Sequence, residues 1–159
     1  MHLKNCALLF TLVFSMAAIS GCDKAKEISA GIGETISTRW FEYTVHSVDK
    51  VNSYAGYEST EDYQLYSVLV TLNNTFDTII PMGTFDFYMD DPIFYEYVWP
   101  LDPLDDTMMP ENFDLRPGQS VQYHMIFEIP VGVSKLELIY TEIDSSDKEG
   151  NTYKIMIGS

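Results

Sequence analysis

Cysteine is almost absent from this sequence. Its 159 residues contain two, Cys6 and Cys22, and both lie near the N-terminus. From residue 23 onward the chain has no thiol for a disulfide, a cysteine nucleophile or the thiolate ligands of a structural zinc site. A domain formed by that part of the chain must be held together by its hydrophobic core, and the chain is long enough to bury one.

Long apolar runs are also scarce. Residues 7–19 are apolar but too few to cross a bilayer as a helix, which takes about 20 residues. They have the length of a secretory h-region, with Lys4 before them and the small residues Ser20 and Gly21 after them. This pattern predicts a cleaved leader at residues 1–21, with Cys22 as the lipid acceptor of a bacterial lipoprotein. The alternative is an ordinary secretory signal beside which Cys22 occurs by chance.

A lipidated Cys22 predicts the location of the protein and its first partner, the membrane. Each buried methylene of an acyl chain contributes about 0.8 kcal/mol, so two or three chains hold a protein durably at the outer face of the cytoplasmic membrane. Residues 22–33 mix charged and small side chains without an apolar stripe, and we interpret them as a tether. The predicted organisation is therefore a leader (1–21), a lipidated tether (22–33) and a domain (34–159).

Basic residues are outnumbered, with 9 Lys and Arg against 24 Asp and Glu and a net charge of −15. The leader contains one of the basic residues, Lys4, and no acid, so its removal makes the protein more acidic. This balance argues against nucleic acid as a partner, because phosphates require basic side chains. It also argues against peripheral docking on anionic lipid, which leaves the covalent anchor as the predicted attachment.

Histidine is equally rare, and only His46 and His124 follow the leader. Both are expected on the polar faces of strands, away from any nucleophile elbow, and two histidines without cysteine do not make up a closed zinc site. Carboxylate pairs of the glycosidase kind arise by chance in a chain with this many acids. We therefore predict a protein that is not an enzyme.

Alternating apolar and polar residues are what the chain does have, and this period of two is typical of half-buried strands. In residues 84–90, for example, Phe85, Phe87 and Met89 are expected to point inward. Three prolines make residues 99–112 a long loop. The predicted strands lie within residues 40–48, 63–74, 84–90, 94–98, 121–129, 136–140 and 153–157. Seven or eight short strands with turns between them predict an all-β, immunoglobulin-like antiparallel β-sandwich, with a small barrel as the alternative.

Five short motifs then occur in a characteristic order after the lipoprotein signal and tether. They are WFEYTV at 40–45, VLVTLNN at 68–74, FDF at 85–87, LRPGQS at 115–120 and FEIP at 127–130. In this order the chain resembles the immunoglobulin-like extracellular lipoprotein domains of unknown function from Gram-positive bacteria, which are similar in fold to immunoprotective extracellular antigens. The resemblance implies a β-sandwich on the outer cell surface and no established activity or site.

Acidic loops make Ca²⁺ the one cofactor to consider, because it takes oxygen ligands from carboxylates and loop carbonyls. None of the loops has the spacing of an EF-hand, so solvated turns are the alternative interpretation. The main candidates are Asp144, Asp147 and Glu149 with Asn151, and the others are Asp90 with Asp91, and Asp102 with Asp105 and Asp106.

Aromatic residues and methionines around the proline-rich loop form the candidate recognition patch. Such side chains are enriched at binding surfaces, and the loops at one end of a sandwich often carry its binding site. The alternative is that about half of them cap the core. The candidates are Tyr54, Tyr57, Phe94, Tyr95, Tyr97, Trp99, Met108 and Met109, together with Leu101.

Two functions follow from this sequence. The first is a non-catalytic, lipid-anchored module that binds an envelope protein or peptide at the cell surface. The second is a ligand-capturing lipoprotein, for carbohydrate or Ca²⁺, that serves a transporter or an enzyme. A small-molecule binder is expected to have a concave pocket lined by aromatic residues. A protein binder is expected to have a broader exposed apolar patch instead.

Overall fold

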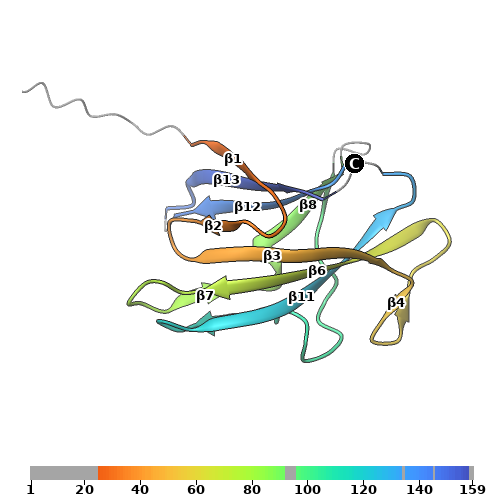
Figure 1. Ribbon diagram of the computed structural model, residues 1–159, viewed down its shortest axis with the longest axis horizontal. Helices are drawn as coiled ribbons and strands as arrows, with labels where there is room; N and C mark the ends of the chain where they lie inside the picture. The colour runs from red at the N-terminus through yellow and green to blue at the C-terminus, as the bar shows by residue number, and fades with distance from the viewer. Residues whose placement is uncertain (1–24, 92–95, 134, 145, 158–159) are drawn as a thin grey trace, which may run out of the picture.

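The computed structural model describes residues 25–91, 96–133, 135–144 and 146–157 (Figure 1). The predicted leader 1–21 and Cys22 lie outside these residues. The described chain is built from strands and one 3₁₀ turn, η1 (Thr84–Asp86). The strands are β1 (Glu27–Ala30), β2 (Thr35–Ser37), β3 (Glu42–Val51), β4 (Ser53–Tyr54), β5 (Tyr57–Glu58), β6 (Tyr63–Asn73), β7 (Ile80–Met82), β8 (Phe87–Asp91), β9 (Glu96–Val98), β10 (Phe113–Leu115), β11 (Ser120–Pro130), β12 (Glu137–Ile143) and β13 (Glu149–Met156). Among the described residues, no helix is long and apolar enough to cross a membrane.

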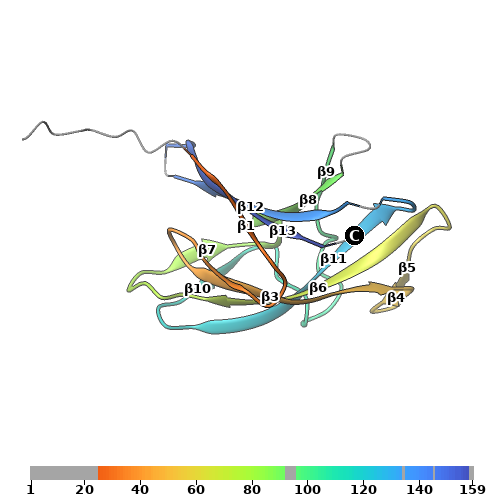
Figure 2. The same cartoon turned by 45° about the horizontal axis from the view of Figure 1, so that its top comes forward.

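Two sheets stacked face to face make up the body of the molecule, as Figure 2 shows from a second side. One sheet has five strands in the order β1-β13-β12-β8-β9, and the other has four in the order β11-β6-β3-β2. Two small pairs, β10-β7 and β4-β5, complete the strands. All pairings are antiparallel except that of β1 with β13. The predicted all-β, immunoglobulin-like sandwich is confirmed, and the two sheets stay separate instead of closing into a barrel.

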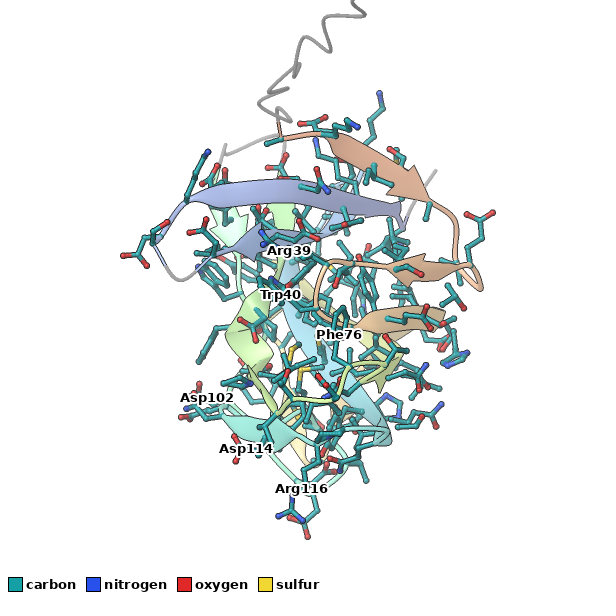
Figure 3. All side chains as sticks on the ribbon, turned by 90° about the vertical axis from the view of Figure 1, so that its left-hand side faces the viewer. Arg39, Trp40, Phe76, Asp102, Asp114 and Arg116 are labelled. Atoms are coloured by element: carbon teal, nitrogen blue, oxygen red, sulfur yellow. The ribbon has the colours of Figure 1, made fainter. Side chains whose placement is uncertain are left out.

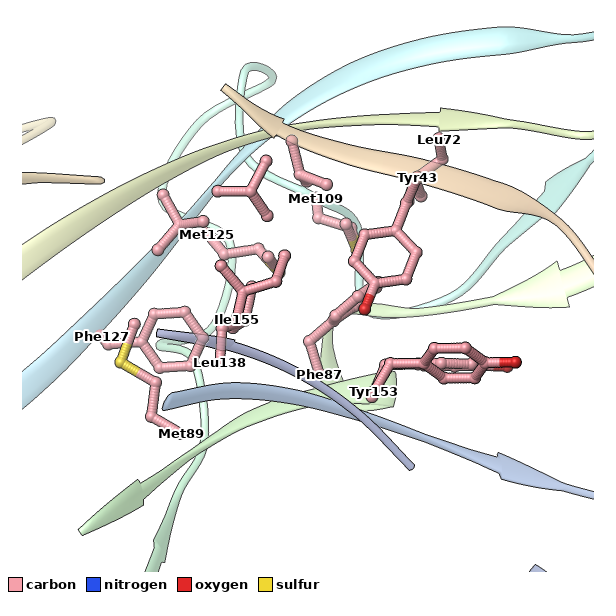
Figure 4. Close-up of a cluster of buried hydrophobic side chains, with 14 of the residues drawn as sticks. Tyr43, Leu72, Phe87, Met89, Met109, Met125, Phe127, Leu138, Tyr153 and Ile155 are labelled. Carbon is pink, nitrogen blue, oxygen red and sulfur yellow. The ribbon is translucent and has the colours of Figure 1, made fainter. Parts of the chain in front are cut away.

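The core lies between the two sheets and follows the predicted alternation (Figure 4). On β6, Val68, Val70 and Leu72 are completely buried, and the five-stranded sheet contributes Phe87 and Met89 from β8. An aromatic group occupies its middle: the ring centroids of Phe41 and Tyr140 lie 5.0 Å apart, and those of Tyr43 and Phe87 lie 5.4 Å apart. Edge-to-face contacts of this kind stabilise a core beyond the area they bury.

A second, smaller core lies on the outer face of the four-stranded sheet. Leu65 of β6 and Ile126 of β11 point away from the main core, yet both are fully buried. They are covered by Met108 from the loop 99–112, which the prolines keep out of the sheets as predicted, and by the β4-β5 hairpin. This face of the sheet is therefore covered over part of its length.

Three features differ from the prediction. Strand β1 lies within the segment 22–33 that we interpreted as a tether, and its parallel pairing with β13 joins Glu27–Ala30 to the sheet. Phe85 points outward with 46% of its surface exposed, because η1 precedes β8 and interrupts the alternation. Apart from β9, which lies within the predicted strand 94–98, the strands of two to four residues were not predicted, since a period of two is not visible over so few positions.

Candidate functional site

Four aromatic side chains gather on the outer face of the five-stranded sheet, at its β8-β9 edge. Phe87 and Met89 enter the core, so Tyr88 between them points outward. On the antiparallel partner β9, Tyr97 lies opposite Asp90 and shares this outer face. The ring centroids of Tyr88 and Tyr97 are 4.7 Å apart, and those of Tyr88 and Trp99 are 5.3 Å apart. We call the group of Phe85, Tyr88, Tyr97 and Trp99 the aromatic cluster.

The turn η1 brings Phe85 into this cluster. The Asp86 carboxylate accepts a hydrogen bond of 2.7 Å from the Gly83 amide, and the Thr84 amide donates to the carbonyl of Pro110 at 3.0 Å. A side chain at Gly83 would collide with the backbone carbonyl of Glu111, so only glycine lets the turn pack this closely. The outcome is that Phe85 and Trp99 meet with ring centroids 6.4 Å apart.

The cluster is open to solvent yet held in place. Tyr97 is 61% exposed, and Trp99 and Phe85 are each 46% exposed. Tyr88 is half-buried, and its hydroxyl shares a hydrogen bond of 3.1 Å with Thr141 on β12. Partial burial is the main reason that the pKa of Tyr88 is raised; Tyr97, Glu149 and Asp90 add to this effect, and the hydrogen bond with Thr141 opposes it. Tyr88 is therefore an uncharged phenol at neutral pH, in acidic surroundings.

The predicted recognition patch is divided by this structure. Tyr97 and Trp99 belong to the aromatic cluster, while Phe94 and Tyr95 lie outside the described residues. The prediction that Met108 and Met109 are exposed is wrong, since they are 1% and 0% exposed. Sequence reasoning also missed Phe85 and Tyr88, although the outward position of Tyr88 follows from the alternation of residues 84–90.

Backbone hydrogen bonds explain why the methionines are buried. The loop 99–112 runs across the four-stranded sheet, where the Leu101 amide donates to Ile126 at 2.7 Å and the Met109 amide donates to His124 at 2.9 Å. Met108 and Leu101 thereby join the smaller core, and Met109 reaches the main one. Residues 99–112, which in the sequence resemble an exposed loop rich in aromatic residues and methionine, therefore cover the outer face of the four-stranded sheet.

Tyr54 and Tyr57 belong to this cover and not to the aromatic cluster. Both are half-buried against the smaller core. The Tyr54 hydroxyl shares a hydrogen bond of 2.7 Å with Thr107, and the Tyr57 hydroxyl donates to Glu128 at 3.1 Å. These contacts assign the two tyrosines a packing role at the β4-β5 hairpin.

The two histidines also differ from each other. His46 is exposed, as predicted, and its Nε2 lies 2.8 Å from the Thr71 hydroxyl. His124 is half-buried under the loop 99–112, and its Nδ1 lies 2.9 Å from the hydroxyl of Ser67, which is 6% exposed. A serine hydroxyl beside a histidine is also the arrangement of a nucleophile and its base. Ser67 is buried, however, so no substrate atom could reach its hydroxyl as such chemistry requires.

The acidic loops use their carboxylates within their own turns. Oδ1 of Asp144 accepts hydrogen bonds from the Ser146 amide at 2.8 Å and its hydroxyl at 2.6 Å. Oδ1 of Asp105 does the same with Thr107. These hydrogen bonds lower the pKa of both aspartates. Across the described part of the chain, no three His, Cys, Asp or Glu side chains form a group that could hold a metal ion, and the calcium site stays a prediction.

A family model covers most of the domain. The model described as "Domain of unknown function (DUF4352)" matches residues 30–152. The chain belongs to this family. A comparison with curated proteins finds no match. The match of the DUF4352 domain covers the whole four-stranded sheet, most of the five-stranded sheet and the aromatic cluster, and the family description names no activity.

Solved structures share the fold of this DUF4352 domain. A Bacillus subtilis protein described as a "putative lipoprotein (ycdA)" has a TM-score of 0.59 at 20% identity, over 77% of this chain and 38% of that one. An uncharacterized beta-sandwich protein from Clostridium difficile 630 has a TM-score of 0.51 at 13% identity, over 84% and 96%. The secreted protein MPT63 of Mycobacterium tuberculosis has a TM-score of 0.59 at 9% identity, over 82% and 99%. This chain thus spans less than half of the first protein, and identities this low establish the fold alone.

Proposed function

We propose that this DUF4352 protein is a lipid-anchored, non-catalytic interaction module that binds a protein or peptide at the cell surface through its aromatic cluster. Secretion and anchoring are supported by the N-terminal pattern that ends at Cys22, and by the lipoprotein and secreted protein that share the fold. The single observation that carries the binding role is the exposed group of Phe85, Tyr97 and Trp99 around a hydrogen-bonded Tyr88.

The shape of the cluster favours a protein over a sugar. Its rings are inclined to one another by 55° to 76°, so they form an uneven apolar surface and not a flat platform. Phe85 borders a cavity of about 580 Å³, but the other lining residues come from β7, the turn around η1, β10 and the loop before β10, and none of them belongs to the cluster. A carbohydrate site is expected to be a concave pocket lined by several aromatic residues, which this arrangement does not provide.

The chemistry of the cluster indicates what kind of partner fits. Exposed Tyr and Trp side chains supply a large contact area at a low cost in side-chain entropy, and they are enriched among residues that dominate binding energy. Asp90 lies opposite Tyr97 in the sheet, and Glu149 is close enough to influence Tyr88. A peptide or protein surface with an apolar centre and a basic rim would complement this patch.

A binding comparison tests the proposal directly. Wild-type protein, a double variant Tyr97→Ala with Trp99→Ala, and a control variant Tyr63→Ala are used to capture cross-linked partners from the native envelope. Tyr63 is a suitable control because it is 43% exposed and starts β6 in the other sheet. We expect the double variant to lose at least about 30-fold in affinity for the captured partner, equivalent to about 2 kcal/mol, and the control to lose little.

Two results would count against the proposal. Equal capture by wild type and by the folded double variant would remove the aromatic cluster from binding. A positive glycan array combined with no captured protein would favour the ligand-capture alternative. Anchoring is tested separately with Cys22→Ser, which is expected to release the protein from the membrane fraction and to abolish its labelling by a fatty-acid analogue.

A further inference from the structure

The N-terminal part of the described chain is fastened to one end of the sandwich. The Lys26 amide donates to the Asn151 side chain at 3.1 Å, and the Lys26 carbonyl accepts from the Thr152 amide at 2.9 Å. From Glu27 onward the chain is part of the sheet. Only residues 23–25 therefore lie between Cys22 and a fixed point at Lys26, a distance of at most about 14 Å for a fully extended chain.

This end of the molecule carries exposed apolar side chains (Figure 3). Phe76 is 43% exposed, Ile79 is 54% exposed and Ile143 is 59% exposed. Ile79 and Ile143 line one cavity of about 330 Å³ together with the half-buried Trp40. Apolar residues from three separate loops and strand ends thus meet at one end, the usual sign of a surface that contacts something.

Basic side chains lie beside Trp40 at this end. Lys26, Arg39 and Lys148 line a second cavity of about 630 Å³, which Trp40 also borders. They are three of the eight basic residues that follow the predicted leader. The guanidinium of Arg39 lies 4.7 Å from the centroid of the Trp40 ring. Arg and Trp side by side can occupy the polar level of a bilayer, where indole rings and phosphates meet.

Two acids at this end, Glu142 and Asp144, are engaged in hydrogen bonds within the protein. Glu142 is 5% exposed and accepts three hydrogen bonds, and Asp144 is held within its turn. Asp77, Asp147 and Glu149 remain at the surface. Asp86 also lines the cavity of Trp40, Ile79 and Ile143, so this end carries basic and acidic side chains together.

We propose that this end is a membrane-docking surface. Trp40, Ile79 and Ile143 contact the headgroup layer of the bilayer, and Lys26, Arg39 and Lys148 contact lipid phosphates. The inference rests on the anchor of the proposed function, since a linker of at most about 14 Å holds this end at the membrane and leaves little room for a protein between them. The net charge of the chain argues against lipid docking as the means by which the protein is attached to the membrane. The covalent anchor already supplies that attachment, so docking is needed only to orient the domain.

Docking of this end directs the aromatic cluster away from the membrane. Val98 lies level with Met89 and Leu138 across the five-stranded sheet. Trp99, the next residue, is therefore level with Ile139 of β12. Ile143 lies four positions further along β12, a distance of about 13 Å at 3.3 Å per residue. An upright domain therefore presents Tyr88, Tyr97 and Trp99 above the headgroups, where a partner has access.

The two tryptophans of the sequence, Trp40 and Trp99, make this orientation measurable. The lipidated protein is reconstituted as Trp99→Phe, which leaves Trp40, and as Trp40→Phe, which leaves Trp99. The vesicles contain phosphatidylglycerol and phosphatidylethanolamine, with a fraction of lipid that carries a nitroxide quencher on its headgroup. We expect Trp40 fluorescence to be quenched at least about 3-fold more than Trp99 fluorescence, because interfacial Trp lies at headgroup level.

Charge introduced at the docking surface provides the second readout. In the Trp99→Phe background, Ile79→Glu and Arg39→Gln are expected to reduce the quenching of Trp40. Val131→Glu is the matched control, because Val131 is 63% exposed and follows β11 at the opposite end of the sandwich. Melting curves of each variant verify that it is folded.

Flotation of the same vesicles separates the two proposals. If the protein floats with the lipid but both tryptophans are quenched equally, or neither is quenched, docking is disproved while the anchor stands. If the protein does not float, the anchor proposal fails. Docking is then tested with residues 22–159, which contain every described strand, coupled through the single thiol of Cys22 to a maleimide lipid. Stronger quenching of Trp40 than of Trp99 then supports docking, and equal quenching of the two refutes it.

Discussion

The carboxylate of Glu142 accepts a hydrogen bond of 2.8 Å from the hydroxyl of Tyr153 in the interior of the sandwich. It also accepts the backbone amides of Arg39 at 2.7 Å and of Asn151 at 3.1 Å. The β12-β13 register shifts between Thr141 and Ile143, and such a bulge leaves backbone groups without ladder partners. Glu142 supplies a partner there and ties the loop before β3 to the five-stranded sheet.

Replacement of Glu142 is therefore expected to destabilise the fold. Glu142→Ala leaves a buried hydroxyl and two backbone amides without their acceptor, so the free energy of unfolding should fall by about 3 kcal/mol. Glu137→Ala on the same strand is the control, because it removes only a surface contact to Lys154 at 3.7 Å and should cost less than about 1 kcal/mol. Urea denaturation measures both, and similar losses for the two variants would contradict the assignment.

Two core tyrosines predict loss of stability at high pH. Burial raises the pKa of both Tyr43 and Tyr140 in the folded state. Because the unfolded chain ionises near pH 10 and the folded chain does not, stability is fully present below about pH 10 and is lost as the pH rises above it. Circular dichroism from pH 8 to 12 should show unfolding together with tyrosine ionisation. Tyr43→Phe should shift the midpoint to higher pH, and an unchanged midpoint would argue against this cause.

Asn74 should be essential for the loop between β6 and β7. It is 2% exposed, its amide donates to the carbonyls of Thr78 at 2.7 Å and Leu115 at 2.9 Å, and its oxygen accepts from Phe76. Asn74→Ala should lower the free energy of unfolding by about 2 to 3 kcal/mol. It should also speed hydrogen exchange in residues 75–79. Asn73→Ala is the control, and equal exchange in both variants would refute this role.

Met108 should stabilise the cover over the four-stranded sheet. It packs on Leu65 and Ile126, so Met108→Ala should leave a cavity and cost about 2 to 4 kcal/mol. Hydrogen exchange should increase in the loop 99–112 more than in the central strands. Met156→Ala is the control, because Met156 is 53% exposed. If Met108→Ala proves as harmless as Met156→Ala, the loop is not held by this contact.

Long strands were predictable from residues alone, and the candidate site only in part. Residues 63–74 show the alternation over six or more positions, and β6 follows it. Tyr97 and Trp99 were among the predicted patch, but Met108 looked equally exposed in sequence. Its burial depends on residues 65 and 126, whose apolar side chains point to the outer face of a distant pair of strands. Contacts of this kind leave no local pattern.

The sequence by itself determined the period-two strands, the acidic balance, the predicted leader that ends before Cys22 and the absence of thiols beyond it. Each of these depends on neighbouring residues or on composition. The tertiary structure decided which aromatic residues remain exposed, that β1 shortens the predicted tether, and that Trp40, Ile79 and Ile143 meet at one end of the sandwich. Those outcomes depend on pairing between segments far apart in the chain, where burial and hydrogen bonds across strands outweigh local preference.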